Sequence, residues 1–261
     1  MCITTTRKKV PGGGENITDT LFELRKFVAP EFIIGVDARR LAGRYAKNFG
    51  ANHVFLVTGP ELIKAGWVGD VTESLESEGI QYTIFPDVSP NPRDYEVMNG
   101  AELYKKKGCD AVIAVGGGSP IDCAKGIGIV VSNEQHILEF EGVDNVSIPA
   151  PPLICIPTTS GSAADVSQFA IINDTKRKVK IAIISKKIVP DISLCDPVPL
   201  TSLTSDLTAH TGMDALVHSI EAYVSNASSP VTDIQALESI RLISAYLPLA
   251  YHNPDHIGYR Y

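Results

Sequence analysis

Short apolar runs alternate with longer amphipathic stretches over residues 50–130 of the chain. Two of these runs, VFLV at 54–57 and AVIAV at 111–115, are uncharged and rich in β-branched residues, as in strands that are buried on both faces. Similar runs predict further strands at 32–34, 81–85, 153–156, 178–184 and 193–195.

Helices are predicted between the first four strands, and each begins at a residue that favours a helix N-terminus. They run from Asp37 to about 48, from Pro60 to about 78, and from Asn91-Pro92 to about 108. Strands and helices that alternate in this way form βαβ units, in which the crossovers place helices on both faces of a parallel sheet. We therefore expect an α/β fold.

The pattern changes near residue 200, where two long segments with helical periodicity follow, at 203–224 and 230–246. We place a domain boundary at 199–203. It divides the chain into an α/β domain at 1–200 and the start of an all-helical domain at 201–261. Residues 1–17 show no periodicity.

Composition narrows the class of protein. The chain has 261 residues, of which 44% are apolar and 20% charged, as in globular proteins. The net charge of -7 disfavours binding to nucleic acid or anionic membranes. There is no apolar run of about 18 residues and no apolar region behind the N-terminal basic residues, so neither a membrane span nor a signal peptide is expected.

Cysteine usage indicates a reducing compartment. The cysteines are widely spaced and include no CxxC pair: Cys2, Cys109, Cys123, Cys155 and Cys195. An odd number of scattered cysteines is typical of reduced thiols, and we expect a cytoplasmic protein.

Three consecutive glycines, Gly116 to Gly118, follow the predicted strand 110–115. Glycines let backbone N–H groups approach an anion closely. Ser119 is predicted as the N-cap of the next helix, with Pro120 at the first helical position and Asp122 as a capping residue at the third. The sequence predicts a phosphate site here, although the spacing is not GxGxxG and a turn without a ligand is the alternative.

A second polar loop, PTTSGS at 157–162, also follows a predicted buried strand. Its hydroxyls can bind a ribose, an adenine edge or a phosphate, and a plain turn stabilised by Ser and Thr is the alternative. In a parallel sheet this loop lies at the same end as the glycines.

Asp214 and His218 lie four residues apart in the segment LTAHTGMDALVHSIEAYV at 207–224. On a helix, both side chains project from one face. A carboxylate and an imidazole can occupy two positions of a divalent metal shell. A surface pair without a metal is the alternative.

Together these motifs resemble the iron-containing (group III) alcohol dehydrogenase family. The matching segments occur in the order of the family: GGGSPIDCAKG at 116–126, PTTSGSAADVSQFAII at 157–172, PDISLCDP at 190–197 and LTAHTGMDALVHSIEAY at 207–223. The resemblance implies an N-terminal Rossmann-like parallel sheet domain and an all-helical metal-binding domain, with the active site between them. It implies an NAD(P)-dependent and metal-dependent dehydrogenase that interconverts small-molecule alcohols and aldehydes by hydride transfer.

The resemblance also assigns roles to single residues. Gly117, Gly118 and Ser119 match the residues that bind the cofactor pyrophosphate. The adenosine and ribose side is assigned to Thr158, Thr159 and Ser162, with Ser167 and Ile171 nearby, the adenine border to Asn91 and Pro92, and the nicotinamide ribose to Lys180. Asp214 and His218 match two ligands of Fe2+, with zinc as the alternative metal. Phe169 matches a position that faces the substrate pocket.

Two departures from the family stand out. Gly59 follows the strand 53–57 where the family often has an aspartate that repels the 2′-phosphate of NADP. We therefore expect NADP to be used at least as well as NAD.

The second departure is at the C-terminus. Two more histidine ligands and a further active-site histidine of the family fall beyond residue 250, so we expect a C-terminally truncated chain. Its catalytic residue is then unknown. Pro254 opposes a helix that would join His252 to His256, and His210 is expected on the surface.

Three readings therefore stay open: the family dehydrogenase, a catalytically impaired nucleotide-binding fragment, and a related polyol dehydrogenase or lyase-type synthase. A helical domain of only two long helices would expose the apolar segments 236–243 and 246–249. We therefore expect partner chains, in the form of a homo-oligomer (dimer or higher).

Overall fold

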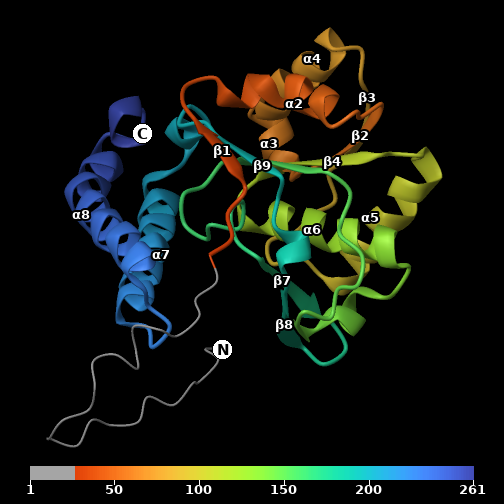
Figure 1. Ribbon diagram of the computed structural model, residues 1–261. Coiled ribbons are helices and arrows are strands. Elements are labelled where there is room, and N and C mark those ends of the chain that lie inside the picture. Colours follow the sequence, from red (N-terminus) through yellow and green to blue (C-terminus); the bar gives the residue numbers. More distant parts are fainter. Residues whose placement is uncertain (1–26) are drawn as a thin grey trace, which may run out of the picture.

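The computed structural model describes residues 27–261, so the expectations for residues 1–17 and for Cys2 lie outside it. A six-stranded sheet in the order β1-β9-β6-β4-β2-β3 forms its centre (Figure 1). Its strands are β1 (Glu31–Ile34), β2 (His53–Val57), β3 (Gln81–Phe85), β4 (Ala111–Gly116), β6 (Leu153–Pro157) and β9 (Ile192–Cys195). Every pairing is parallel, which confirms the predicted sheet.

Helices cover both faces of this sheet (Figure 1). One face carries the 3-10 helix η1 (Ala38–Leu41) with α2 (Ala42–Asn48), α3 (Pro60–Lys64) and α4 (Trp67–Ser77). The other carries α5 (Asp94–Lys107) and α6 (Gly118–Asn133). The short elements η2 (Ile137–Phe140) and η3 (Lys186–Ile188) complete the second face.

A second, smaller sheet has the order β5-β8-β7 and was not foreseen as a sheet. It consists of β5 (Gly142–Val143), β7 (Phe169–Asp174) and β8 (Val179–Ile184), with β7 and β8 antiparallel. Only β8 was predicted from the pattern. Ala170 and Ile172 of β7 are buried in the same cluster as α6, so the hairpin packs on that helix.

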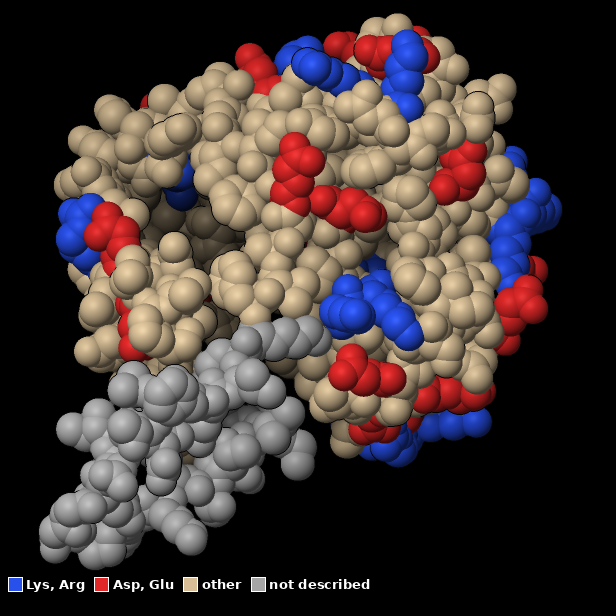
Figure 2. Space-filling model, in the orientation of Figure 1, with Lys and Arg blue, Asp and Glu red and all other residues tan. Residues whose placement is uncertain are grey.

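The C-terminal part is helical. After η4 (Pro199–Ser202), the long helices α7 (Ser205–Val224) and α8 (Pro230–His252) lie side by side next to the α/β body, and η5 (Ile257–Tyr259) follows (Figure 1). Helix α8 continues through Pro248 and ends at His252, six residues past its predicted end at 246. Figure 2 shows a hollow between this helical pair and the body.

The predicted exposure of apolar side chains on α8 is confirmed. Leu237 is 50% exposed, and Tyr246 and Leu249 are exposed as well, whereas Ala236 is buried. No helix in residues 27–261 combines the length and the apolar character needed to cross a membrane.

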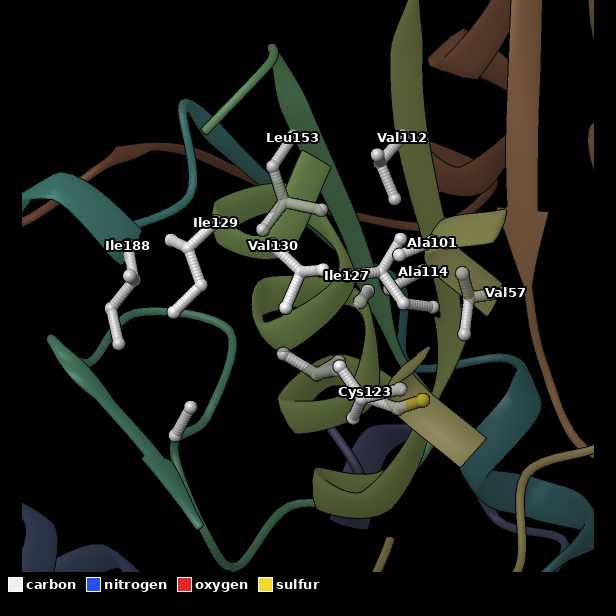
Figure 3. Packing of buried hydrophobic residues seen from close by; sticks show 14 of the residues in the cluster. Val57, Ala101, Val112, Ala114, Cys123, Ile127, Ile129, Val130, Leu153 and Ile188 are labelled. Atoms are coloured by element: carbon white, nitrogen blue, oxygen red, sulfur yellow. The ribbon is translucent and has the colours of Figure 1, made fainter. Parts of the chain in front are cut away.

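Strand β4 is buried on both faces, as its unbroken apolar run predicts. Ile113 belongs to the core under α2 and α4, whereas Val112 and Ala114 belong to the core under α5 and α6. In Figure 3 the labelled side chains of this second core come from the strands β2, β4 and β6, from the helices α5 and α6, and from η3.

Two predicted helix boundaries and one predicted side-chain cap are wrong, and in each case a residue adopts a left-handed backbone. The helix expected over 60–78 is broken at Gly66, whose φ is 87°, into α3 and α4. Asp37 has a φ of 65° and caps no N–H, so the chain begins a 3-10 helix there. Asn91 has a φ of 58°, and the next helix begins only after Arg93.

Candidate cofactor and metal site

The two polar loops predicted from the sequence lie side by side at the carboxyl edge of the large sheet. Strands β4 and β6 are neighbours, and Gly116 pairs with Pro157 at their ends. The backbone N–H of Thr158 donates to the carbonyl oxygen of Gly116 at 3.0 Å. The glycine loop (116–118) and the hydroxyl loop (157–168) therefore leave the sheet together.

The glycine loop needs glycine because the hydroxyl loop packs directly on it. A Cβ at Gly117 would lie 2.7 Å from Thr159 Oγ1, and a Cβ at Gly118 would lie 2.9 Å from Ser162 Oγ. Contacts below about 3.0 Å force a shift of the neighbouring atoms. The two loops thus pack into one unit at the carboxyl edge of the sheet, which we call the cradle.

The predicted cap of the following helix is wrong. Helix α6 begins at Gly118, its N-cap is Gly117, and no side chain caps it. Ser119 Oγ instead accepts a hydrogen bond from the backbone N–H of Asn91 at 3.0 Å. The first N–H groups of α6 are therefore left for another acceptor, which is how helix N-termini bind anions.

Several residues assigned by the family resemblance come together beside the cradle. Lys180 Nζ on β8 donates to Asn91 Oδ1 at 2.6 Å, and Asn173 Nδ2 on β7 donates to the carbonyl oxygen of Asn91 at 2.8 Å. Asn91 thus links Ser119 of α6 to the hairpin. Gly59 is the N-cap residue of α3 and lies just after the carboxyl end of β2, the strand next to β4.

Behind the cradle lie two charged groups, half-buried Asp122 and fully buried Lys125, that the sequence patterns did not single out for their chemistry. Asp122 is not a helix cap: its carboxylate accepts from the backbone N–H of Ile171. Burial raises the pKa of Asp122 to about 6, against the opposing effects of Lys125 and the Ile171 N–H. Lys125 in turn donates to the carbonyl oxygen of Ser167 at 2.8 Å. The sequence offered one sign of this arrangement, which is that Lys125 interrupts an otherwise apolar face of the predicted helix.

Asp214 and His218 project from one face of α7, as predicted. His218 Nε2 lies 3.6 Å from Asp214 Oδ1, and His218 Nδ1 lies 3.7 Å from Glu221 Oε2. The side chains of Asp214 and His218 are 51% and 56% exposed. The pair suits two positions of a metal shell in chemistry and spacing, but residues 27–261 contain no group of three or more ligand side chains that could hold an ion.

Three further histidines discussed above as possible ligands do not join Asp214 and His218 in one cluster. His256 stacks on Tyr259 with ring centroids 4.0 Å apart, and His252 packs edge-on against Tyr251. His210 is exposed on α7.

A cavity of about 810 Å³ lies between the carboxyl edge of the sheet and the helical pair. Its lining includes polar groups of the hydroxyl loop and apolar groups of α8, among them Thr159, Ser160, Asp165, Leu242, Tyr246 and Leu247. Phe169 does not line this cavity, and at 42% exposure it is not packed in the core either.

A parallel sheet with a glycine loop at its carboxyl edge is the arrangement of nucleotide-binding α/β proteins. Comparison with known families is more specific. The family described as iron-containing alcohol dehydrogenase matches residues 29–197, and the C-terminal part of the Fe-containing alcohol dehydrogenase family matches residues 208–260. The chain belongs to the iron-containing alcohol dehydrogenase family.

Relatives and solved structures agree with this assignment. The NAD-dependent methanol dehydrogenase of Bacillus methanolicus is 38% identical over 234 residues, which are 90% of this chain and 61% of that enzyme. Alcohol dehydrogenase 4 of Schizosaccharomyces pombe is 42% identical over 87% of this chain and 54% of its own length. A crystal structure of 1,3-propanediol oxidoreductase aligns with a TM-score of 0.90 at 36% identity, covering 91% of this chain and 63% of that one. The chain thus spans about three-fifths of the length of these proteins.

The raised pKa of Asp122 predicts a pH-dependent stability difference between the protein and an Asp122→Asn variant. The unfolded carboxyl has a pKa of 3.8, and the folded one has a pKa of about 6. Between these values the folded state binds more protons than the unfolded state, so the wild type loses stability as pH rises. The amide of the variant does not titrate, so this source of lost stability is absent from it. We expect the variant to gain about 2–3 kcal/mol relative to wild type between pH 4 and pH 8, measured by urea unfolding. An equal difference at both pH values would contradict this.

Proposed function

We propose that this chain functions in NAD(P)-dependent and metal-dependent alcohol dehydrogenation, the interconversion of alcohols and aldehydes. The observation that carries the proposal is the cradle, where Gly117 and Gly118 meet Thr159 and Ser162 without room for a Cβ. Its relatives named above include an NAD-dependent methanol dehydrogenase.

In this proposal the cradle binds the dinucleotide. The N–H groups of Gly118 and Ser119 at the uncapped start of α6 would bind the pyrophosphate. The adenosine and ribose side would fall to the loops on either side of it: Asn91, Pro92, Thr158, Thr159, Ser162, Ser167 and Ile171. Lys180, exposed on β8 and held by Asn91, would donate to the nicotinamide ribose. The chain's contribution to hydride transfer is then to orient the cofactor.

Asp214 and His218 would supply two ligands of a divalent metal, Fe2+ or alternatively Zn2+. A metal in such a site lowers the pKa of an alcohol hydroxyl by Lewis-acid polarisation. The exposed carboxylate and imidazole lie within 3.6 Å of each other, which supports binding at one ion. A nucleotide-binding chain without catalysis is a second candidate, because a third ligand is missing among the described side chains.

The proposal extends to location and assembly. The four described cysteines are free thiols, which supports the cytoplasm. The exposed apolar side chains of α7 and α8 support a homo-oligomer. The functional division into a cofactor part and a metal part would fall near residue 200, at η4.

Gly59 allows a direct test of cofactor choice. Its Cβ would have space, since the nearest atom is the Val88 carbonyl oxygen at 4.0 Å. In Gly59→Asp the new carboxylate would accept hydrogen bonds from the ribose of NAD and repel the 2′-phosphate of NADP. We expect the ratio of the Kd for NADP to the Kd for NAD to rise at least about tenfold in fluorescence titrations. The neutral Gly59→Asn variant is the control, and an unchanged ratio in Gly59→Asp would contradict the assignment of Gly59.

The metal assignment is tested by comparing histidines on the same helix. We expect His218→Gln to weaken Fe2+ binding at least about tenfold, because a ligand is lost, while His210→Gln leaves binding unchanged. Metal affinity is measured by competition with a chelator, alongside alcohol-dependent reduction of NADP and NAD. Equal metal affinity in both variants and the wild type would exclude His218. Cofactor binding without any turnover would favour the second candidate.

A further inference from the structure

Lys125 is a lysine with no exposed surface, on the second turn of α6 behind the glycine loop. Its Nζ donates to the carbonyl oxygens of Ser167 and Phe169, both at 2.8 Å, and lies 3.4 Å from Ser167 Oγ. Desolvation lowers the pKa of this ammonium. A buried charge is costly, so the polar contacts that it makes call for an explanation.

The groups around the ammonium are mostly backbone. Asp122 and Asp165 contribute favourable charge, yet neither carboxylate forms an ion pair with Lys125 within the described part of the chain. The neutral thiol Cys155 is also close. The main partners of Lys125 are therefore these two carbonyls, one at the end of the hydroxyl loop (Ser167) and one at the start of β7 (Phe169).

The hydroxyl loop has few other anchors. At its start, the Thr158 N–H donates to Gly116 O, and in its middle Ser193 Oγ donates to Asp165 Oδ2 at 2.7 Å. Ala163 adopts a φ of 50°, which is unfavourable for alanine and needs support from its surroundings. Beyond Asp165, Lys125 fixes the loop where it enters β7, together with the bond from Ser185 N–H to Gln168 O.

We propose that Lys125 is a positioning residue for the cofactor site. By fixing the carbonyls of Ser167 and Phe169 to α6, it holds the hydroxyl loop against the glycine loop that begins the same helix. Thr159 and Ser162 then keep the spacing from Gly117 and Gly118 that closes the cradle. This inference rests on the proposed dinucleotide-binding function.

Lys187 offers a matched control. Its Nζ also donates to two carbonyl oxygens, those of Val146 at 2.7 Å and Ser147 at 2.6 Å, but it does so away from the cradle. Lys187→Met therefore removes a comparable clamp from a loop without a proposed ligand. Lys125→Met removes the ammonium and keeps the apolar stem, and Lys125→Gln keeps one short donor.

The experiment compares these three variants with wild type for NADPH and NADH affinity, by fluorescence titration, and for amide hydrogen exchange in peptides covering 158–169. We expect Lys125→Met to raise both Kd values at least about tenfold and to speed exchange in 158–169 at least about tenfold. Lys125→Gln is expected to lie between Lys125→Met and wild type. Lys187→Met should leave both Kd values unchanged and speed exchange only near residues 146–147.

Two outcomes would overturn the proposal. One is unchanged affinity and exchange in Lys125→Met. The other is failure of both Lys125 variants to fold while Lys187→Met folds, because the lysine would then hold the whole fold and not the loop. Failure of the wild type to bind either cofactor would instead contradict the proposed function, while exchange in 158–169 would still decide whether Lys125 clamps the loop.

Discussion

The close contact between the glycine loop and the hydroxyl loop is the constraint on which the site depends. Strands β4 and β6 are paired, so the loops that leave them are neighbours from the start. Gly117 and Gly118 then lie so near Thr159 and Ser162 that a Cβ would collide. Strand β4 is buried on both faces, and α6 begins at the same edge with N–H groups that no described side chain caps.

Much of the fold and part of the site could be predicted from local pattern. Strongly apolar runs specify β2, β4 and β6, and the parallel arrangement brings both loops to one edge. Local pattern does not predict the structure correctly where a contact distant in sequence, or a left-handed backbone conformation, determines the helix end or cap. Apolar periodicity continues across Gly66, although its φ of 87° breaks the helix. Ser119 is a good N-cap by residue type. Its hydroxyl oxygen instead accepts a hydrogen bond from the backbone N–H of Asn91, 28 positions earlier in the sequence. The hydrogen bonds of Lys125 reach carbonyl oxygens 42 and 44 positions away in the sequence, beyond the range of any local sequence pattern.

The two halves of the proposed chemistry are unequally built within residues 27–261. The cofactor half is assembled from four strands' ends and their loops, with several interlocking hydrogen bonds. The metal half consists of two side chains on α7, Asp214 and His218. They lie one helical turn apart, and each is about half exposed. The chain belongs to the family and spans about three-fifths of the length of its relatives.

The central claim, that the cradle binds a dinucleotide, is tested most directly by titrating the wild type and Gly117→Ala with NADPH and NADH. The added methyl would meet Thr159 Oγ1 at 2.7 Å and open the cradle. We expect the wild type to bind both cofactors and Gly117→Ala to raise each Kd at least about tenfold, with a folded protein in both cases. Equal affinity of the two proteins, or no binding by the wild type, would contradict it.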